Sequence, residues 1–173
     1  MKGLRIAGLD AGTRNLGFCV IETPDVQNPI VWMHVDLFPR RRDKGKPTSV
    51  EIVTATVHWL RGHRALLESC DVIVLENQMR TPFEILNAVV SAHYLEKVEV
   101  LNPRTVGRFW GLPSQRAPKK KAGVSCVAQN GCQFPPVRNK KYDDVADAWL
   151  LAVYAAVHRG EVEHVEKYNE ELL

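Results

Sequence analysis

Cysteine is scarce in this chain, and none of it has the spacing of a metal site. The four cysteines stand at positions 19, 70, 126 and 132, and no two of them form a Cys-x-x-Cys pair. Structural zinc sites and the disulfide frameworks of small secreted domains both use closely spaced cysteines, so these two classes are disfavoured. We expect small buried thiols in a reducing compartment instead.

Long hydrophobic runs are also missing. No stretch reaches the roughly 20 apolar residues of a membrane-spanning helix, and the amino terminus lacks the pattern of a signal or transit peptide. We therefore expect no contact with a membrane and a cytoplasmic location, in a cell or a virus-infected cell. With 173 residues, 45% of them hydrophobic and 25% charged, the chain is long enough for one domain and too short for two ordinary ones.

Charge is nearly balanced overall but unevenly distributed along the chain. The formal net charge is +3, from 23 basic and 20 acidic residues. Residues 161–173 hold five glutamates against one lysine, which leaves 22 basic and 15 acidic residues before them. We therefore divide the chain into a single basic domain, residues 1–160, and an acidic C-terminal tail, residues 161–173. A basic domain suits a polyanionic partner, although a solvated basic surface explains the charge equally well.

Short apolar segments predict five strands. The first three lie close together and are separated by Gly, Asn and Pro, which is typical of an antiparallel meander. A nearly continuous apolar run over residues 71–76 predicts a buried central strand. The five predicted strands span residues 4–11, 17–22, 30–37, 71–76 and 97–101.

Apolar residues at helical spacing predict the remaining elements. Thr48 and Glu51 form a capping-box pattern at the start of a helix over residues 49–68. Further helices are predicted over residues 83–96 and 140–158, with a weak helical stretch after residue 103, whereas prolines and glycines predict an irregular, mobile segment over residues 112–139. This order predicts an α/β domain whose mixed five-stranded sheet, three antiparallel strands and then parallel ones, is flanked by helices.

Acidic side chains stand at three points of this predicted fold. Asp10 lies near the end of the first strand and Glu76 ends the most hydrophobic strand, and in open sheets sites gather at such ends. Asp144 and Asp147 are three residues apart near the start of the last helix, so they share one of its faces. Taken alone, Asp10 could instead be a turn residue and Glu76 a charge at a sheet edge, which are the less favoured alternatives. Asp143 or Asp144 alone fits a complement to the helix dipole.

Together these carboxylates predict a metal site. Several like charges in one place repel one another unless a cation neutralises them. A ligand set of carboxylate oxygens without His or Cys favours Mg²⁺ or Mn²⁺. The histidines offer no competing site, because only His58 and His63 are near neighbours and they fall on different helix faces.

Three segments together resemble a known family. They are Ile6–Gly17 (IAGLDAGTRNLG), Val72–Arg80 (VIVLENQMR) and Lys140–Ala148 (KKYDDVADA). In this order they resemble the three acidic motifs of RuvC-type Holliday junction resolvases, which belong to the ribonuclease H-like superfamily. Gln78 and the two lysines before the paired aspartates are most similar to the poxviral and fungal mitochondrial branches.

The resemblance implies a ribonuclease H-like fold and a metal-dependent endonuclease. Family members bind branched DNA, the four-way junction, as a homodimer and resolve it by paired symmetric nicks. Carried over by motif, the catalytic residues and metal ligands are Asp10, Glu76, Asp144 and Asp147, with Asp143 as the alternative to Asp144. Two Mg²⁺ or Mn²⁺ ions per site would activate a water and stabilise an in-line displacement at phosphorus.

Basic residues supply the other implied contacts. Lys121 resembles the family's active-site lysine, although it stands in a run of three lysines that a solvated surface would also explain. Phe83, Phe109 and Trp110 could stack on bases at a junction, but core packing is the more usual role for such side chains. The candidate phosphate contacts are Arg40, Arg41, Arg42, Arg80, Lys119, Lys120, Arg138, Lys140 and Lys141.

Three other functions fit parts of the sequence. Leu9–Thr13 (LDAGT) also resembles the phosphate-binding turn of actin-like and sugar-kinase ATPases, but that architecture needs two lobes and more than twice this length, so we expect no nucleotide cofactor. A catalytically silent junction-binding module would share the predicted fold. So would another ribonuclease H-like nuclease acting on flaps, forks or hybrids, which the sequence does not separate from a resolvase.

Overall fold

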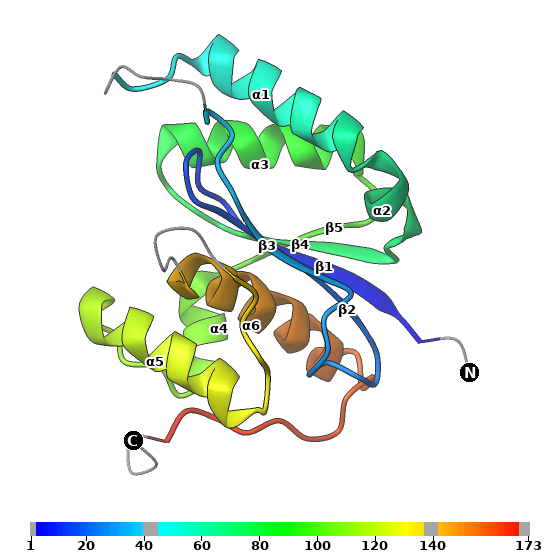
Figure 1. Ribbon diagram of the computed structural model, residues 1–173, viewed down its shortest axis with the longest axis vertical. Coiled ribbons are helices and arrows are strands. Elements are labelled where there is room, and N and C mark those ends of the chain that lie inside the picture. The colour runs from blue at the N-terminus through cyan, green and yellow to red at the C-terminus, as the bar shows by residue number, and fades with distance from the viewer. Residues whose placement is uncertain (1–2, 40–44, 137–141, 170–173) are drawn as a thin grey trace.

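A five-stranded mixed sheet forms the centre of the computed structural model, which describes residues 3–39, 45–136 and 142–169 (Figure 1). The strands lie in the order β3-β2-β1-β4-β5. They are β1 (Arg5–Asp10), β2 (Leu16–Glu22), β3 (Val31–Val35), β4 (Val72–Glu76) and β5 (Val98–Leu101). β1, β2 and β3 form an antiparallel meander, whereas β4 pairs parallel with β1 and β5 pairs parallel with β4. This arrangement confirms the predicted α/β fold and its mixed sheet.

The register of the sheet aligns the polar ends of several strands. Asp10 pairs with Gly17 across β1 and β2, and Gly17 pairs with His34 across β2 and β3. On the other side of β1, Leu9 pairs with Leu75 in the parallel ladder. Asp10 and Glu76, each one residue further on, therefore end neighbouring parallel strands at the same edge of the sheet.

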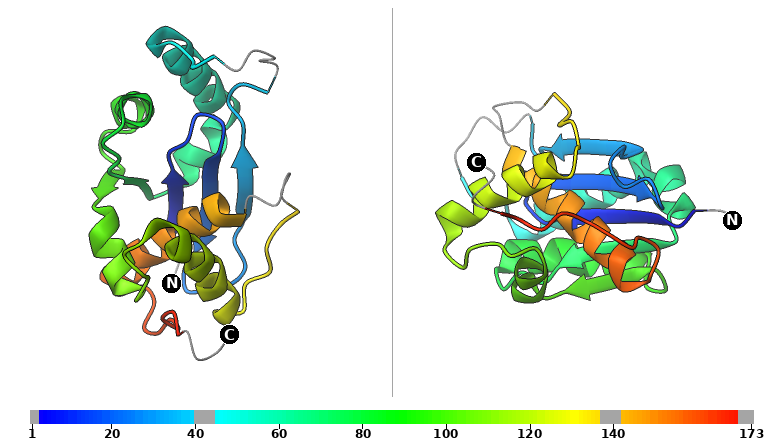
Figure 2. Two further views of the ribbon diagram at one scale, coloured as in Figure 1. Left: turned by 90° about the vertical axis from the view of Figure 1, so that its left-hand side faces the viewer. Right: turned by 90° about the horizontal axis from the view of Figure 1, so that it is seen from below.

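Helices cover both faces of the sheet. α1, α2 and α3 lie over one face, and α4, α5 and α6 lie over the other (Figures 1 and 2). Their bounds are α1 (Ser49–Gly62), α2 (Arg64–Ser69), α3 (Thr81–His93), α4 (Pro103–Phe109), α5 (Arg116–Gln129) and α6 (Tyr142–His158). Within the described ranges, each of these helices is too short or too polar to cross a membrane.

The first helical segment begins where the sequence predicts and then divides. Thr48 Oγ1 accepts a hydrogen bond from the Glu51 backbone N–H, while Glu51 Oε2 accepts one from the Thr48 N–H, so the capping box is formed. The predicted continuous helix over residues 49–68 is instead α1 followed by α2. His63 lies between them with φ −112° and ψ 14°, which departs from helical geometry.

The predicted irregular segment over residues 112–139 is wrong for residues 116–129, which form α5. Pro118 stands in the first turn of this helix, where its missing N–H removes no intrahelical hydrogen bond. Gly123 lies where α5 meets α6, because a Cβ at this position would be 3.4 Å from Leu150 Cδ1. The residues that suggested a loop therefore serve helix initiation and close helix packing.

α6 lies directly on β1 and β2 because two glycines leave room for its backbone. A Cβ at Gly8 would overlap the carbonyl oxygen of Ala148, and a Cβ at Gly17 would overlap that of Asp144. Larger residues would push the helix away from the sheet. The close approach holds the first turns of α6 beside the end of β1.

Two tryptophans anchor α6 from within the core. The Trp149 indole N–H donates to the Val26 carbonyl oxygen at 2.8 Å, and that of Trp110 donates to the Leu150 carbonyl oxygen at 3.1 Å. Both indoles are fully buried, and Phe109 packs edge-on against Trp110. These aromatic side chains therefore belong to the core, in agreement with the more usual role weighed from the sequence.

Residues 161–169, here called the C-terminal strap, lie against α5 and the core. The Glu166 backbone N–H donates to Asn130 Oδ1 at 2.9 Å, and Asn130 Nδ2 donates back to the Glu166 carbonyl oxygen at 2.7 Å. Val162 is buried, and the Tyr168 backbone N–H donates to the Trp110 carbonyl oxygen. The described part of the predicted acidic tail thus follows the surface of the domain (Figure 1).

Candidate active site

A cleft of about 370 Å³ lies where the ends of β1 and β4 meet the first turns of α6. Asp10, Glu76, Asp144 and Asp147 all line it. The structure thus brings together four acids that the chain separates by up to 137 positions, from Asp10 to Asp147. The spatial convergence on which the sequence interpretation depends is present.

An amide links the carboxylates of the two strand ends. Gln78 Nε2 lies 2.9 Å from Asp10 Oδ1 and 3.1 Å from Glu76 Oε2, so one nitrogen donates to both side chains. Gln78 follows β4 by two residues, and the loop that carries it is tied to α3 because Asn87 Nδ2 donates to the Glu76 carbonyl oxygen at 2.8 Å. The two acids are therefore held with their oxygens converging on one point.

α6 presents its three aspartates differently. Asp144 and Asp147 face the cleft, whereas Asp143 forms an ion pair with Lys120 and is absent from the cleft lining. The helical repeat explains the difference, because neighbouring residues point about 100° apart while residues at a spacing of three share a face. The geometry therefore places Asp144 in the cleft and its alternative, Asp143, outside the cleft lining.

Burial and mutual repulsion raise the pKa values of the acids in the cleft. The pKa of Asp10 lies well above its ordinary value because the carboxyl group is desolvated and because Asp147 and Glu76 repel its charge. Burial, together with repulsion from Glu76, raises the pKa of Asp147 to about 7. Burial also raises the pKa of Glu76, against the opposing effects of Lys119 and Gln78. Raised pKa values at several neighbouring carboxyl groups indicate that the cleft has too little positive charge to balance them.

Lys119 and Lys120 approach the acids from α5. Both line the cleft, and the positive charge of Lys119 lowers the pKa values of Glu76 and Asp147. Although partial burial alone would lower the pKa of Lys120, its hydrogen bond and ion pair with Asp143 raise it. Lys121, the lysine that the sequence resemblance selects, is exposed and does not line the cleft. Which lysine faces the cleft depends on its direction about the axis of α5. The sequence could not supply this direction, because the segment was predicted to be irregular.

His34 is a member of this neighbourhood that the sequence analysis passed over. Its Nε2 lies 3.1 Å from Asn15 Oδ1 and 3.8 Å from Asp144 Oδ2. His34 pairs with Gly17 across β2 and β3, and the backbone of Asp144 packs against Gly17. The His34 side chain therefore lies close to Asp144. The register of the β-meander was the only signal for it, because His34 is far from the acidic motifs along the chain.

The other predicted contact residues divide into those at the cleft and those outside the described ranges. Arg80 lines the cleft, and so does Phe83, which is half-buried and also contacts the core on the α1–α3 side of the sheet. The remaining candidate phosphate contacts, Arg40, Arg41, Arg42, Arg138, Lys140 and Lys141, lie outside the residues that the structure describes.

The donor set of the cleft fits a hard divalent cation. All four acidic ligand candidates offer oxygens, and two of them already direct an oxygen at the same hydrogen-bond donor. Within the described ranges, no three Asp, Glu, His or Cys side chains stand close enough together to hold one ion as they are.

Solved structures of low sequence identity share this fold. The fowlpox virus resolvase in complex with substrate Holliday junction DNA matches with a TM-score of 0.64 at 15% identity, covering 90% of this chain and 99% of that one. RuvC of T. thermophilus in complex with a Holliday junction substrate matches with a TM-score of 0.61 at 17% identity, covering 91% and 95%. The yeast mitochondrial Holliday junction resolvase Ydc2 matches with a TM-score of 0.60 at 18% identity, covering 86% and 77%. The fold is therefore that of the RuvC-like, ribonuclease H-type proteins.

The family follows from the sequence itself. The family model described as Poxvirus A22 protein matches residues 5–159, which is most of the chain. The chain belongs to this family, and the resemblance drawn from the three acidic motifs is confirmed. No curated protein sequence matches the chain.

Proposed function

We propose that this protein is a structure-selective, metal-dependent DNA endonuclease that resolves four-way junctions by paired symmetric nicks. The observation that carries the proposal is the cleft at the ends of β1 and β4, in which Asp10, Glu76, Asp144 and Asp147 meet in a chain of the Poxvirus A22 protein family. The resolvases of the same fold are named as acting on, or are bound to, Holliday junctions. Recombination, repair or processing of a viral genome would require this activity.

The four acids are proposed as the metal ligands and catalytic residues. Mg²⁺ or Mn²⁺ is the expected cofactor, with two ions per site, and bound ions would supply an activated water and stabilise the oxygens of an in-line displacement at phosphorus. Asp10 and Glu76 end neighbouring strands and Asp144 and Asp147 lie near the start of α6, so these elements bring the backbone positions of all four acids to one cleft. Gln78 holds the first two in a common orientation.

Basic residues at the cleft are proposed to bind the DNA backbone. Lys119 is placed to offset negative charge that develops on the scissile phosphate, because it already acts on the carboxylates of Glu76 and Asp147. Arg80, in the loop between β4 and α3, would contact a neighbouring phosphate. Phosphate contacts of this kind position the substrate and make the affinity fall with salt.

A homodimer would place two such clefts on one junction, as paired cuts require. We further propose that the protein acts in the cytoplasm of a cell or of a virus-infected cell. All four cysteines are buried and free, which suits a reducing compartment.

Cleavage of a set of labelled DNA substrates tests the function. Four-way junctions, forks, flaps, linear duplexes and RNA–DNA hybrids of matched sequence are incubated with the protein in Mg²⁺ and, separately, in Mn²⁺. We expect two symmetric nicks in the four-way junction and little cutting of linear duplex. Preferred cutting of flaps, forks or hybrids would assign a different ribonuclease H-like nuclease, and junction binding without any strand break would assign a silent binding module.

Conservative variants test the residues. Asp10→Asn, Glu76→Gln and Asp147→Asn are each expected to reduce junction cleavage by at least about 100-fold, because each removes a charged oxygen ligand. Junction binding measured without metal should remain within a few-fold of the parent protein, since phosphate contacts are unchanged. Retained cutting in any one variant would remove that residue from the catalytic set.

A further inference from the structure

Two further cavities continue from the active-site cleft towards α4. One has a volume of about 450 Å³ and is lined by Arg104, Arg108 and Lys119 among others; the second, of about 510 Å³, is lined by Arg80 and Arg104. Lys119 also lines the active-site cleft, and so does Arg80. The three cavities therefore share their basic side chains and form one path. We call the two outer cavities, with Arg80, Arg104, Arg108 and Lys119, the basic groove.

In the part of the chain that the structure describes, the basic groove contains a single carboxylate. It is Glu76, which lines one outer cavity at its junction with the active site, and no described carboxylate lines the cavity between α4 and α5. None of the four basic side chains forms an ion pair with a carboxylate in the part of the chain that the structure describes. Three surface arginines elsewhere are paired with carboxylates: Arg5 with Glu22, Arg64 with Glu68 and Arg159 with Glu99.

The local structure keeps these charges side by side. Arg104 and Arg108 are one helical turn apart on α4, so their side chains leave the same face of the helix, and both are exposed. Gly107 lies between them, and a Cβ on this glycine would be 3.9 Å from Lys119 Cε. The lysine stem therefore runs along the surface of α4. Arg104, Arg108 and Lys119 place like charges together, with Glu76 as the one described carboxylate that lines the groove, and such an arrangement favours a polyanion.

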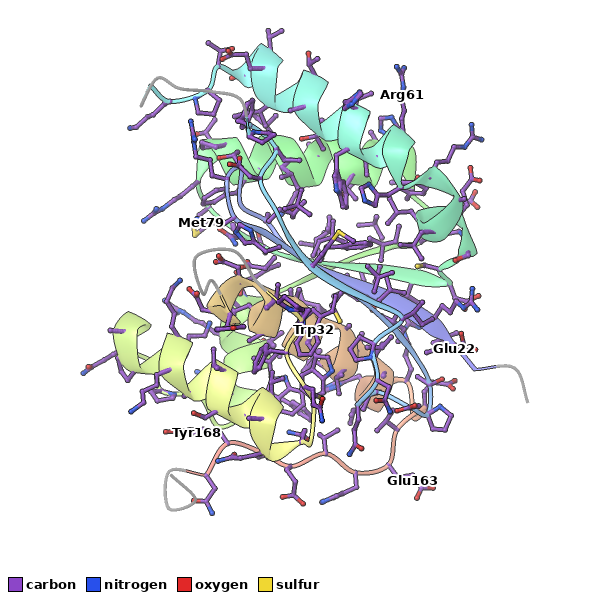
Figure 3. The ribbon with its side chains drawn as sticks, in the orientation of Figure 1. Glu22, Trp32, Arg61, Met79, Glu163 and Tyr168 are labelled. Atoms are coloured by element: carbon purple, nitrogen blue, oxygen red, sulfur yellow. The ribbon has the colours of Figure 1, made fainter. Side chains whose placement is uncertain are left out.

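We propose that the basic groove binds the phosphate backbone of the DNA arm that leaves the active-site cleft, with Arg104 and Arg108 as its outer contacts. This inference rests on the proposed function and extends it, because neither arginine belongs to the acidic motifs or to the basic segments recognised from the sequence. The groove begins at Glu76 and Gln78 and ends on α4, so it sets the direction in which the cleaved strand passes over the protein. Met79, which is labelled in Figure 3, lines the second outer cavity and is 92% exposed.

The double variant R104Q/R108Q tests the groove, and R61Q/R64Q is its matched control. Arg61, labelled in Figure 3, and Arg64 are exposed on α1 and α2, which cover the face of the sheet opposite α4 (Figure 1). Binding of a four-way junction is measured by fluorescence anisotropy from about 50 to 200 mM salt, without metal. We expect R104Q/R108Q to lose roughly 10- to 30-fold in affinity and to reduce the slope of log K against log salt by about 2, since each phosphate contact contributes about 0.9. The control should differ from the parent protein by less than about twofold in affinity.

A charge-conserving variant separates loss of contact from loss of structure. R104K/R108K should recover most of the affinity and the salt slope, because phosphate binding needs the positive charge more than the guanidinium shape. Melting temperatures of all variants should agree within about 2 °C, since both side chains are exposed. Loss of affinity that lysine does not recover would overturn the proposal.

The remaining outcomes distinguish the groove from the proposed function. If the parent protein cleaves junctions and R104Q/R108Q binds them with unchanged affinity and slope, the groove assignment fails and the function stands. If the parent protein shows no preference for junctions but R104Q/R108Q weakens its binding to linear duplex, the function fails and the groove stands. A change from dimer to monomer in R104Q/R108Q, measured by sedimentation, would place the groove at a subunit contact and overturn the inference.

Discussion

Asp147 stands beside Glu76 in the cleft, and burial raises its pKa to about 7. Its carboxyl group titrates near 3.8 when unfolded, so protonation stabilises the folded state. This stabilisation is fully present below the unfolded pKa of 3.8 and is lost as the pH rises through the folded pKa of about 7. In a chelator at pH 7.5, Asp147→Asn is therefore expected to raise the melting temperature by about 2–6 °C, since about 1 kcal/mol moves it by about 2–4 °C in a chain of this size.

The same linkage predicts a pH-dependent response to metal. Mg²⁺ or Mn²⁺ should raise the melting temperature of the parent protein more at pH 7.5 than at pH 5.5, because protons compete with the cation for the same oxygens. Asp147→Asn should show a smaller metal-induced rise at pH 7.5. Differential scanning fluorimetry in chelator and in metal measures both effects, and an equal rise in the two proteins would contradict a ligand role for Asp147.

Lys119 and Lys121 offer a matched pair on one helix. Lys119→Ala is expected to lower the single-turnover rate of junction cleavage by about tenfold or more, because it removes the positive charge that faces Glu76 and Asp147. Lys121→Ala should leave that rate within about twofold, because Lys121 is exposed outside the cleft. The reverse ranking would restore the lysine that the sequence resemblance selects.

At the scale of residues, the convergence of the four acids in one cleft could be predicted, whereas the direction in which each lysine of α5 points could not. Asp10 and Glu76 were recognisable because each closes an apolar run, and a strand end has one position in a sheet. The choices between Asp143 and Asp144, and among the lysines of α5, depend on the rotation of a helix about its axis. One residue of uncertainty in a helix is about 100° of direction, so sequence spacing alone could not settle them.

Between elements, the contact of α6 with the sheet determines whether the site forms. Gly17→Ala is expected to destabilise the protein by about 1–3 kcal/mol, because the new Cβ overlaps backbone rather than a flexible side chain. It should also lower junction cleavage, since the displaced backbone is that of Asp144. Chemical denaturation and a cleavage assay on the refolded protein measure the two effects.

Gly62→Ala is the control for that substitution. Among the residues that the structure describes, nothing lies within 4 Å of a Cβ at Gly62, which ends α1 on the other face of the sheet. Alanine is the better helix former, so this variant should be neutral or slightly stabilising and should cleave normally. A comparable loss in both variants would mean that glycine flexibility, rather than the close approach of α6, matters at Gly17.

The strands were easier to predict than the helices for a physical reason. Buried strands are read from short apolar runs, and all five were located. α5 was missed because its apolar contacts come from small residues such as Ala122 and Cys126, while lysines, proline and glycine dominate its composition. Its packing against α6 and the strap supplies the stability that its local sequence does not indicate.

Over the whole molecule, paired cutting requires two clefts on one DNA. If the protein acts as a homodimer, mixing equal amounts of the parent protein and Asp10→Asn before assembly gives roughly half mixed dimers. On a plasmid carrying an extruded cruciform, parent dimers should yield linear product and mixed dimers should yield nicked circles. Linear product in proportion to the parent protein alone, with no rise in nicked circles, would show that the two cuts come from one subunit.

The arrival of α6 after all five strands has a consequence during synthesis. A ribosome releases the sheet, with Asp10 and Glu76, before it releases Asp144 and Asp147. A partly made chain therefore carries half of the acidic set and no complete cleft. If the four acids form the active site as proposed, the order of the elements delays nuclease competence until the last helix has docked.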